Sequence, residues 1–264
     1  MLNRRTLIVA GGLAVPLMLA PERADAQARA TTRDDGPLTV LLEAIAPFSF
    51  QDAEGKPVGY AVELMQELLR RCKLAARLEF NSWASIYQRA QTQPRVLVAD
   101  MTRLAEREKL FYWIGPTATR RLFLYRLKSR PEVQPLTLEG AKAFKTAVIR
   151  DDASERDLLA RGFELGRHLD RSPDYAALLR KLFARRDELM AMNSTVAAAT
   201  LHRYGYDLKQ IEPVVKVSDS HAFMALSLNS GAALCARLSR GWETMRHNGT
   251  VATIAARYPS VALD

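Results

Sequence analysis

The 264-residue sequence has only two cysteines, Cys72 and Cys235, and four histidines that lie far apart. It contains neither a Cys-x-x-Cys nor a His-x-x-x-His pair, so the spacing typical of zinc sites and thiol redox sites is missing. We therefore expect no metal and no cofactor. Two interpretations of the cysteines stay open. In an oxidising compartment they can form a disulfide, whereas at apolar helical positions each behaves as a small hydrophobic residue.

The sequence also lacks an apolar run long enough to cross a bilayer. The run at 7–20 is about fourteen residues, and a spanning helix needs roughly twenty. It follows a basic start at Arg4 and Arg5 and precedes a small-x-small site at 24–26, the three-part layout of a secretory signal peptide. The Arg-Arg pair fits a twin-arginine signal and an ordinary one alike. We expect residues 1–26 to be removed and the mature chain to be periplasmic.

A concentrated charge of one sign is missing as well. The net charge is +9, from 38 Lys and Arg against 29 Asp and Glu, but the basic residues are scattered among carboxylates, as at 185–188. A basic chain can favour anionic partners, yet no basic stripe interleaved with aromatic residues is present. We therefore expect a solvated surface and no nucleic-acid partner. We also expect a monomeric protein.

What the sequence does contain is an alternation of strand and helix patterns. The first series predicts strands at 38–42, 78–80 and 96–99 and helices at 61–72 and 83–90. The second predicts strands at 147–149 and 189–192 and helices at 154–161, capped near 152–154, 175–184 and 196–204. This alternation is typical of a mostly parallel sheet flanked by helices. Two such α/β series predict two lobes.

The remaining segments predict further elements. Residues 122–125 form a strand pattern between the two series. The spacing of apolar residues between Leu234 and Met245 predicts a helix, which Gly249 ends because glycine accepts a left-handed conformation. Thr250 is then expected to cap a last helix that runs to Tyr258.

Four segments spread over the chain form a joint pattern. They read APFSFQDAEGKPVGY at 46–60, TRLAEREKLFYWIGP at 102–116, LFARRD at 182–187 and MRHNGTVATIAARY at 245–258. In this order, and behind a signal peptide, they resemble a divergent branch of the family 3 periplasmic solute-binding proteins. This is the amino-acid-binding type associated with ABC importers.

The resemblance implies a type II periplasmic binding protein fold, with two lobes joined by two crossover strands. Each lobe is a mostly parallel sheet flanked by helices, and the ligand lies between the lobes. It predicts a first lobe from 37–120 and 220–264, and a second lobe from 121–219, with strands near 122 and 216. Such a protein captures a small carboxylate-bearing solute, an amino acid or a related metabolite, and hands it to ABC permease subunits.

The resemblance also implies ligand contacts in the first lobe. Arg107 matches an arginine that grips the ligand's carboxylate, because its planar fork donates two parallel hydrogen bonds. Thr102 matches a hydroxyl position beside it, Trp83 an aromatic position flanking the ligand, and Glu43 an acid that meets a cationic side chain in some relatives. Each also has a purely structural interpretation: a surface arginine, a loop threonine, a core tryptophan and a solvated carboxylate. Phe48 is expected to fill the core.

The second lobe departs from the family pattern. Met192 or Asn193 stands where the family has an aspartate that pairs with an α-amino group, and Asn193 supplies no negative charge. Asp152 lies in an altered loop at 151–154. Asn193 and Asp152 remain candidate ligand contacts, but a carboxylate, an amine-poor metabolite or some ligand gripped mainly by the first lobe fits as well.

Three functions remain possible on this fold: a transport receptor, a non-transport periplasmic sensor or accessory protein, and a small-acid dehydratase or lyase. An enzyme needs a positioned general acid or base. Glu43, Asp100, Asp152 and His221 are conceivable, but they form no recognisable constellation, and the Gly-x-Ser-x-Gly nucleophile motif is absent. We therefore expect a binding protein that is not an enzyme.

Overall fold

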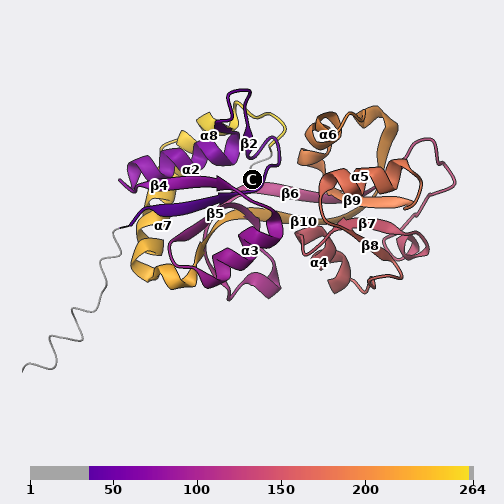
Figure 1. Ribbon diagram of the computed structural model, residues 1–264, viewed down its shortest axis with the longest axis horizontal. Coiled ribbons are helices and arrows are strands. Elements are labelled where there is room, and N and C mark those ends of the chain that lie inside the picture. The colour runs from indigo at the N-terminus through magenta and orange to yellow at the C-terminus, as the bar shows by residue number, and fades with distance from the viewer. Residues whose placement is uncertain (1–35, 262–264) are drawn as a thin grey trace, which may run out of the picture. The chain divides into compact units, whose positions relative to one another are not determined.

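Strands and helices alternate through the first part of the chain, as the sequence predicts (Figure 1). The computed structural model describes residues 36–261, so the predicted signal peptide at 1–26 lies outside the described residues. β1 pairs in parallel with both β4 and β5. The elements of this first series are β1 (Leu38–Leu42), β2 (Phe50–Gln51), β3 (Pro57–Val58), α2 (Tyr60–Arg71), β4 (Ala76–Phe80), α3 (Trp83–Thr92) and β5 (Val96–Thr102).

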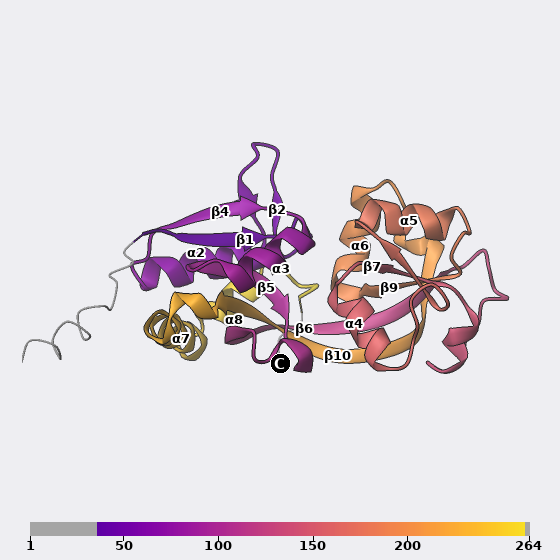
Figure 2. The ribbon, with the colours of Figure 1, turned by 60° about the horizontal axis from the view of Figure 1, so that its bottom comes forward.

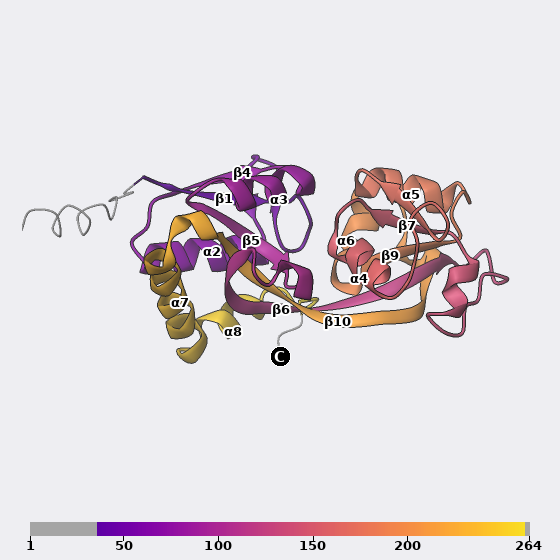
Figure 3. The same cartoon turned by 90° about the horizontal axis from the view of Figure 1, so that it is seen from below.

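A second parallel set of strands, β7 to β9, follows, with helices α4 to α6 beside it (Figure 3). Strand β8 was not predicted, because its sequence Leu-Asp-Arg-Ser has two charged residues in the middle and is buried only at its ends. The elements are β7 (Thr146–Ile149), α4 (Ala153–Ala160), β8 (Leu169–Ser172), α5 (Tyr175–Phe183), β9 (Leu189–Asn193) and α6 (Ser194–Arg203).

Two long strands, β6 (Phe111–Leu127) and β10 (Ile211–Ser227), join the two sets. They pair antiparallel from Phe111 opposite Ser227 to Leu127 opposite Ile211, and run side by side between the other strands (Figures 1 and 2). The resulting order is β4-β1-β5-β10-β6-β9-β7-β8. This confirms the two-lobed α/β fold and the crossover strands near 122 and 216. We call the half with β1, β4 and β5 the first lobe, and the half with β7, β8 and β9 the second.

The C-terminal helices α7 (Ala232–His247) and α8 (Thr250–Ala255) pack against α2 of the first lobe (Figure 2). Gly249 separates them at φ 77°, as predicted. The prediction that Thr250 caps α8 is wrong: it lies inside the helix, and Asn248 Oδ1 accepts hydrogen bonds from its backbone N (3.2 Å) and hydroxyl (2.6 Å). Helix α8 also ends at Ala255, before Tyr258.

Short 3-10 turns connect several of these elements. Among the described residues they are η1 (Ala105–Arg107), η2 (Gly140–Ala143), η3 (Leu208–Gln210) and η4 (Leu228–Ser230). Arg107, the strongest candidate for ligand recognition in the sequence, is the last residue of η1.

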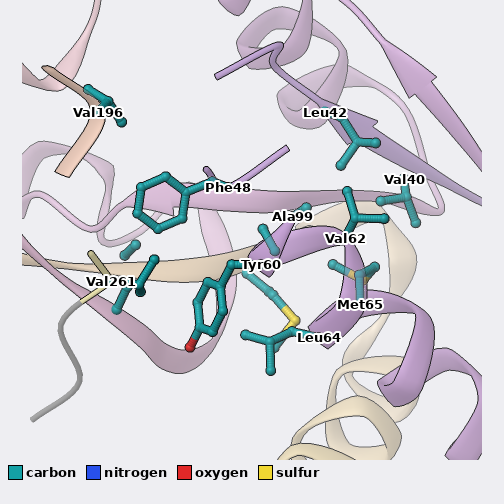
Figure 4. Close-up of a cluster of buried hydrophobic side chains, with 14 of the residues drawn as sticks. Val40, Leu42, Phe48, Tyr60, Val62, Leu64, Met65, Ala99, Val196 and Val261 are labelled. Atoms are coloured by element: carbon teal, nitrogen blue, oxygen red, sulfur yellow. The ribbon is translucent and has the colours of Figure 1, made fainter. Parts of the chain in front are cut away.

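A large apolar cluster includes buried residues of the first-lobe sheet, α2 and α7, and it also extends to second-lobe residues such as Val196 (Figure 4). Phe48 is 1% exposed and packs edge-on against Tyr60, with ring centroids 6.1 Å apart, so it fills the core as expected. The Tyr60 hydroxyl keeps a hydrogen-bond partner in this interior, because it donates to the Thr117 carbonyl at 2.6 Å.

Both cysteines are free thiols, which favours the small-hydrophobe interpretation over the disulfide. Cys72 is buried between α2 and α7, where Gly241 makes room for it: a Cβ at Gly241 would lie 2.5 Å from the Cys72 sulfur. Within residues 36–261, no helix combines the length and apolar character needed to cross a bilayer.

A pair of glycines before α2 offers a test of the packing. Both have a positive φ, but a Cβ at Gly59 would lie 2.6 Å from the Phe48 carbonyl oxygen, whereas a Cβ at Gly55 would meet nothing within 4 Å. Gly55→Ala should therefore lower the free energy of unfolding by about 1 kcal/mol, through backbone strain alone. Gly59→Ala adds a steric clash and should cost at least about 3 kcal/mol. Urea denaturation measures both, and equal losses would contradict this account of Gly59.

Candidate ligand-binding site

A pocket with about 90 Å³ of free volume is lined by residues from both lobes. It contains all six predicted ligand contacts, which are Glu43, Trp83, Thr102, Arg107, Asp152 and Asn193. Glu43 directly follows β1, and Thr102 and Asn193 are the last residues of β5 and β9. The carboxyl ends of strands from both halves therefore meet at this pocket, the usual position of ligands in open α/β sheets.

Arg107 is the most deeply buried charged residue of the pocket, at 1% exposure. Its guanidinium lies over the rings of Trp83 (5.1 Å to the centroid) and Tyr87 (5.2 Å). Burial lowers the pKa of Arg107, and the negative charge of Asp152 opposes that effect. Such a group is not deprotonated in proteins, so it needs acceptors for its N–H groups.

The protein supplies hydrogen-bond acceptors for only some of the N–H groups of Arg107. The Nη1 atom of Arg107 donates to the Thr102 carbonyl at 3.3 Å, and Nη2 donates to the Asp151 carbonyl at 3.2 Å. The Nε atom is buried and has no hydrogen-bond partner among the described residues. A buried donor without an acceptor is costly, so the arrangement favours an anionic partner at this side of the guanidinium.

The Asp151 carbonyl links the two lobes. It accepts a second hydrogen bond, from Trp83 Nε1 at 2.8 Å, so two donors of the first lobe share one acceptor of the second. Asp151 has φ 58°, unusual for a residue other than glycine, and its carboxylate binds Arg156 at 2.8 Å. Trp83 thus does more than flank the pocket, because its N–H reaches across to the second lobe.

Acidic side chains line the same pocket as Arg107. Glu43, Asp100 and Asp152 line it together with Arg120, whose guanidinium pairs with Asp100 and lies 3.6 Å above the Phe48 ring centroid. Burial, then the charges of Asp152 and Asp100, raise the pKa of Glu43 to about 8, while Arg120 opposes the shift. Within residues 36–261, no group of three or more acidic, His or Cys side chains could hold a metal ion.

Asp152 and Asn193 each have a structural role in addition to lining the pocket. The Asp152 carboxylate caps α4, accepting from the Ala153 backbone N–H and from the Ser154 hydroxyl at 3.0 Å. This confirms the cap predicted near 152–154. Asn193 caps α6 through its Oδ1, which accepts from the Thr195 backbone N–H at 2.9 Å.

Sequence reasoning missed other lining residues. Arg120 and Tyr175 gave no local signal, because their position depends on long-range pairing of strands and on packing between the lobes. Asp151 was noted only as part of an altered loop. His221, considered as a possible proton donor, does not line this pocket.

Comparison with known proteins identifies the family. The model of the bacterial extracellular solute-binding proteins, family 3, matches residues 38–260. The chain belongs to this family. The match includes the four segments that carried the resemblance in the sequence, and it spans both lobes of this family 3 protein. No curated protein sequence gives a significant match.

Solved structures share the fold at low sequence identity. A histidine kinase sensor domain with similarity to periplasmic binding proteins is 21% identical, with a TM-score of 0.77, covering 86% of this chain and 98% of that one. An ancestral arginine-binding protein bound to arginine is 19% identical, with a TM-score of 0.73 and coverages of 84% and 98%. The arginine-, lysine-, histidine-binding protein ArtJ from Geobacillus stearothermophilus is 16% identical, with a TM-score of 0.72 and coverages of 84% and 95%.

Two tryptophans allow a matched test of the link between the lobes of this family 3 protein. Trp83→Phe keeps an aromatic ring but removes the N–H that donates to the Asp151 carbonyl. One lost hydrogen bond of about 1 kcal/mol should speed amide exchange at 151–154 about fivefold, as measured by hydrogen–deuterium exchange mass spectrometry. Trp113→Phe is the control, because that indole donates to the Glu108 carbonyl at 3.1 Å, away from the second lobe. Equal amide exchange rates at 151–154 in both variants would show that the Trp83 hydrogen bond does not stabilise this segment.

Proposed function

We propose that this protein captures a small solute that carries both a carboxylate and a cationic group, such as a basic amino acid. The observation that carries the proposal is the distribution of charge in one pocket. Arg107 has a buried Nε–H without a partner, and Glu43 and Asp152 line the same space without an ion-pair partner in the described part of the chain. A solute with both charges satisfies both sides of the pocket at once.

The carboxylate of the solute would bind Arg107 and Thr102. The rings of Trp83 and Tyr87 and the two carbonyls hold the guanidinium in place, so little side-chain entropy is lost on binding. A planar fork held in this way suits a carboxylate, because it can donate two parallel hydrogen bonds.

The cationic group would bind on the acidic side, near Glu43 and Asp152. Asp152 offers the negative charge that Asn193 lacks, so the missing family aspartate does not exclude an ammonium or guanidinium group. The amide of Asn193 would add a polar contact from the second lobe. The names of two similar structures, arginine-binding proteins, support a basic amino acid.

We further propose that the protein is exported by the signal at 1–26, acts as a periplasmic monomer and delivers its ligand to ABC permease subunits. The family's extracellular description supports export. In this proposal the first lobe comprises 37–120 and 220–264 and the second 121–219, so that β6 and β10 form the crossing.

A soluble sensor is the second candidate, because a histidine kinase sensor domain shares the fold with a TM-score of 0.77. The two roles differ in what fails when the gene is deleted. A receptor for import is needed for uptake of the bound solute, whereas a sensor is needed only for the transcriptional response to it. Radiolabelled uptake and transcript measurements on the same deletion strain separate them.

Arg107→Gln tests the carboxylate contact. Removing one partner of a buried, hydrogen-bonded charge pair costs about 2–5 kcal/mol, so affinity for the bound amino acid should fall at least about 30-fold in titration calorimetry. The ligand panel is L-arginine, L-lysine and L-histidine. Agmatine, which is arginine without its carboxylate, should bind the unaltered protein as weakly as arginine binds the variant.

Arg103→Gln is the matched control for that experiment. Arg103 also lies over two aromatic rings, those of Trp113 and Phe223, and pairs with Glu108, but it does not line the pocket. Its replacement should change affinity by no more than about twofold, since the ion pair and the ring contacts that it removes lie outside the pocket. Equal losses in both variants, or none in Arg107→Gln, would refute a carboxylate grip by Arg107.

A further inference from the structure

We propose that Glu43 holds a proton that the cationic group of the ligand displaces, so that binding releases about one proton at neutral pH. The inference rests on the proposed function and adds a regulation of the same site. It follows from the placement of Glu43 in the pocket together with Asp100 and Asp152, where the cation that acts on it, Arg120, is already paired with Asp100.

The groups around Glu43 come from four different elements. Asp100 is on β5, Arg120 on β6, Asp152 at the start of α4 and Tyr175 at the start of α5. Burial and the charges of Asp152 and Glu43 raise the pKa of Tyr175 well above its ordinary value, so this hydroxyl stays neutral. Among residues 36–261, Arg120 is the one cation whose charge lowers the pKa of Glu43.

Arg120 cannot neutralise this side of the pocket alone. Its guanidinium pairs with Asp100 and lies against the Phe48 ring, and only 11% of its side chain is exposed. Glu43 is half-buried, so an ionised Glu43 would lose part of its hydration and would share the pocket with Asp152 without a cation of its own. Burial without a partner disfavours a charged carboxylate strongly, and binding a proton removes the charge.

The pKa of the Glu43 carboxyl agrees with this geometry. Burial and the neighbouring carboxylates raise the pKa of Glu43 to about 8. At pH 7 roughly nine-tenths of the molecules would then carry a proton on Glu43. When a ligand ammonium or guanidinium enters, the O–H bond of Glu43 breaks, its proton passes to the buffer, and the ligand's positive charge takes its place.

The sign of the pH dependence follows from this exchange. The ligand cation binds the ionised form of Glu43, which becomes scarcer as the pH falls below 8. Affinity should therefore fall about tenfold between pH 7 and pH 6 and level off above pH 8. The ligand's carboxylate and its guanidinium or side-chain ammonium do not titrate in this range, so they add no slope of their own.

Titration calorimetry at pH 7.0 in phosphate, HEPES and Tris buffers measures the released proton, because these buffers differ in ionisation enthalpy. The probe is L-arginine or L-lysine, whichever binds more tightly, because the imidazole of L-histidine itself titrates near pH 6.5. We expect about 0.9 proton released per ligand bound. Glu43→Gln, which carries no ionisable group, should release none, and its affinity should be constant between pH 6 and pH 8.

Two further variants test whether Glu43 is the group that releases the proton. Asp152→Asn keeps a residue that caps helices equally well but removes a charge that raises the pKa of Glu43, so it should release fewer protons at pH 7. Asp152→Asn also tests the proton exchange if Glu43→Gln fails to fold. Glu54→Gln, an exposed change in the loop between β2 and β3, should release as many protons as the unaltered protein.

The outcomes separate this inference from the proposed function. Binding of a probe with the same heat in all three buffers would overturn the proton exchange and leave the binding function standing. Proton release that persists in Glu43→Gln, or is unchanged in Asp152→Asn, would also overturn it. If no probe binds, both the proposed function and the proton exchange fail.

Discussion

The antiparallel pairing of β6 with β10 is the constraint on which the rest of the structure depends. These 17-residue strands are the central members of the sheet, and each continues from one lobe into the other. They place the carboxyl ends of β1 and β5 opposite those of β7 and β9, which is why the pocket takes residues from both sets. A register shift of one residue in this pair would turn side chains of these strands to the opposite face of the sheet in both lobes.

Local patterns in the sequence were sufficient to predict most of the fold. The apolar strands and amphipathic helices were found near their observed positions, because burial on one face produces a periodic pattern. Strand β8 escaped because its central residues are charged, and the cap of α8 was assigned to Thr250 although Asn248 is the acceptor. Both errors concern short elements where tertiary contacts override a local signal.

The pocket was predictable only in part, for a related reason. Arg107, Thr102 and Trp83 belong to segments with a recognisable family pattern, and all three line it. Arg120 and Tyr175 belong to no such segment, and they reach the pocket through strand pairing and the packing of the lobes. The sequence could show which charges exist, but the balance between a buried guanidinium and several carboxylates depends on distances that only the fold sets.

The contact between the lobes at Asp151 is made by a main-chain carbonyl in a left-handed conformation. Every amino acid has this carbonyl, so the side chain at 151 contributes to the contact mainly through the backbone shape that it permits. Over evolution the position should accept Asn or Gly, which adopt that shape readily, and reject Val, Ile and Thr, whose branched Cβ opposes it. Divergence in ligand preference can thus proceed at neighbouring positions while this one changes only within a narrow set of residues.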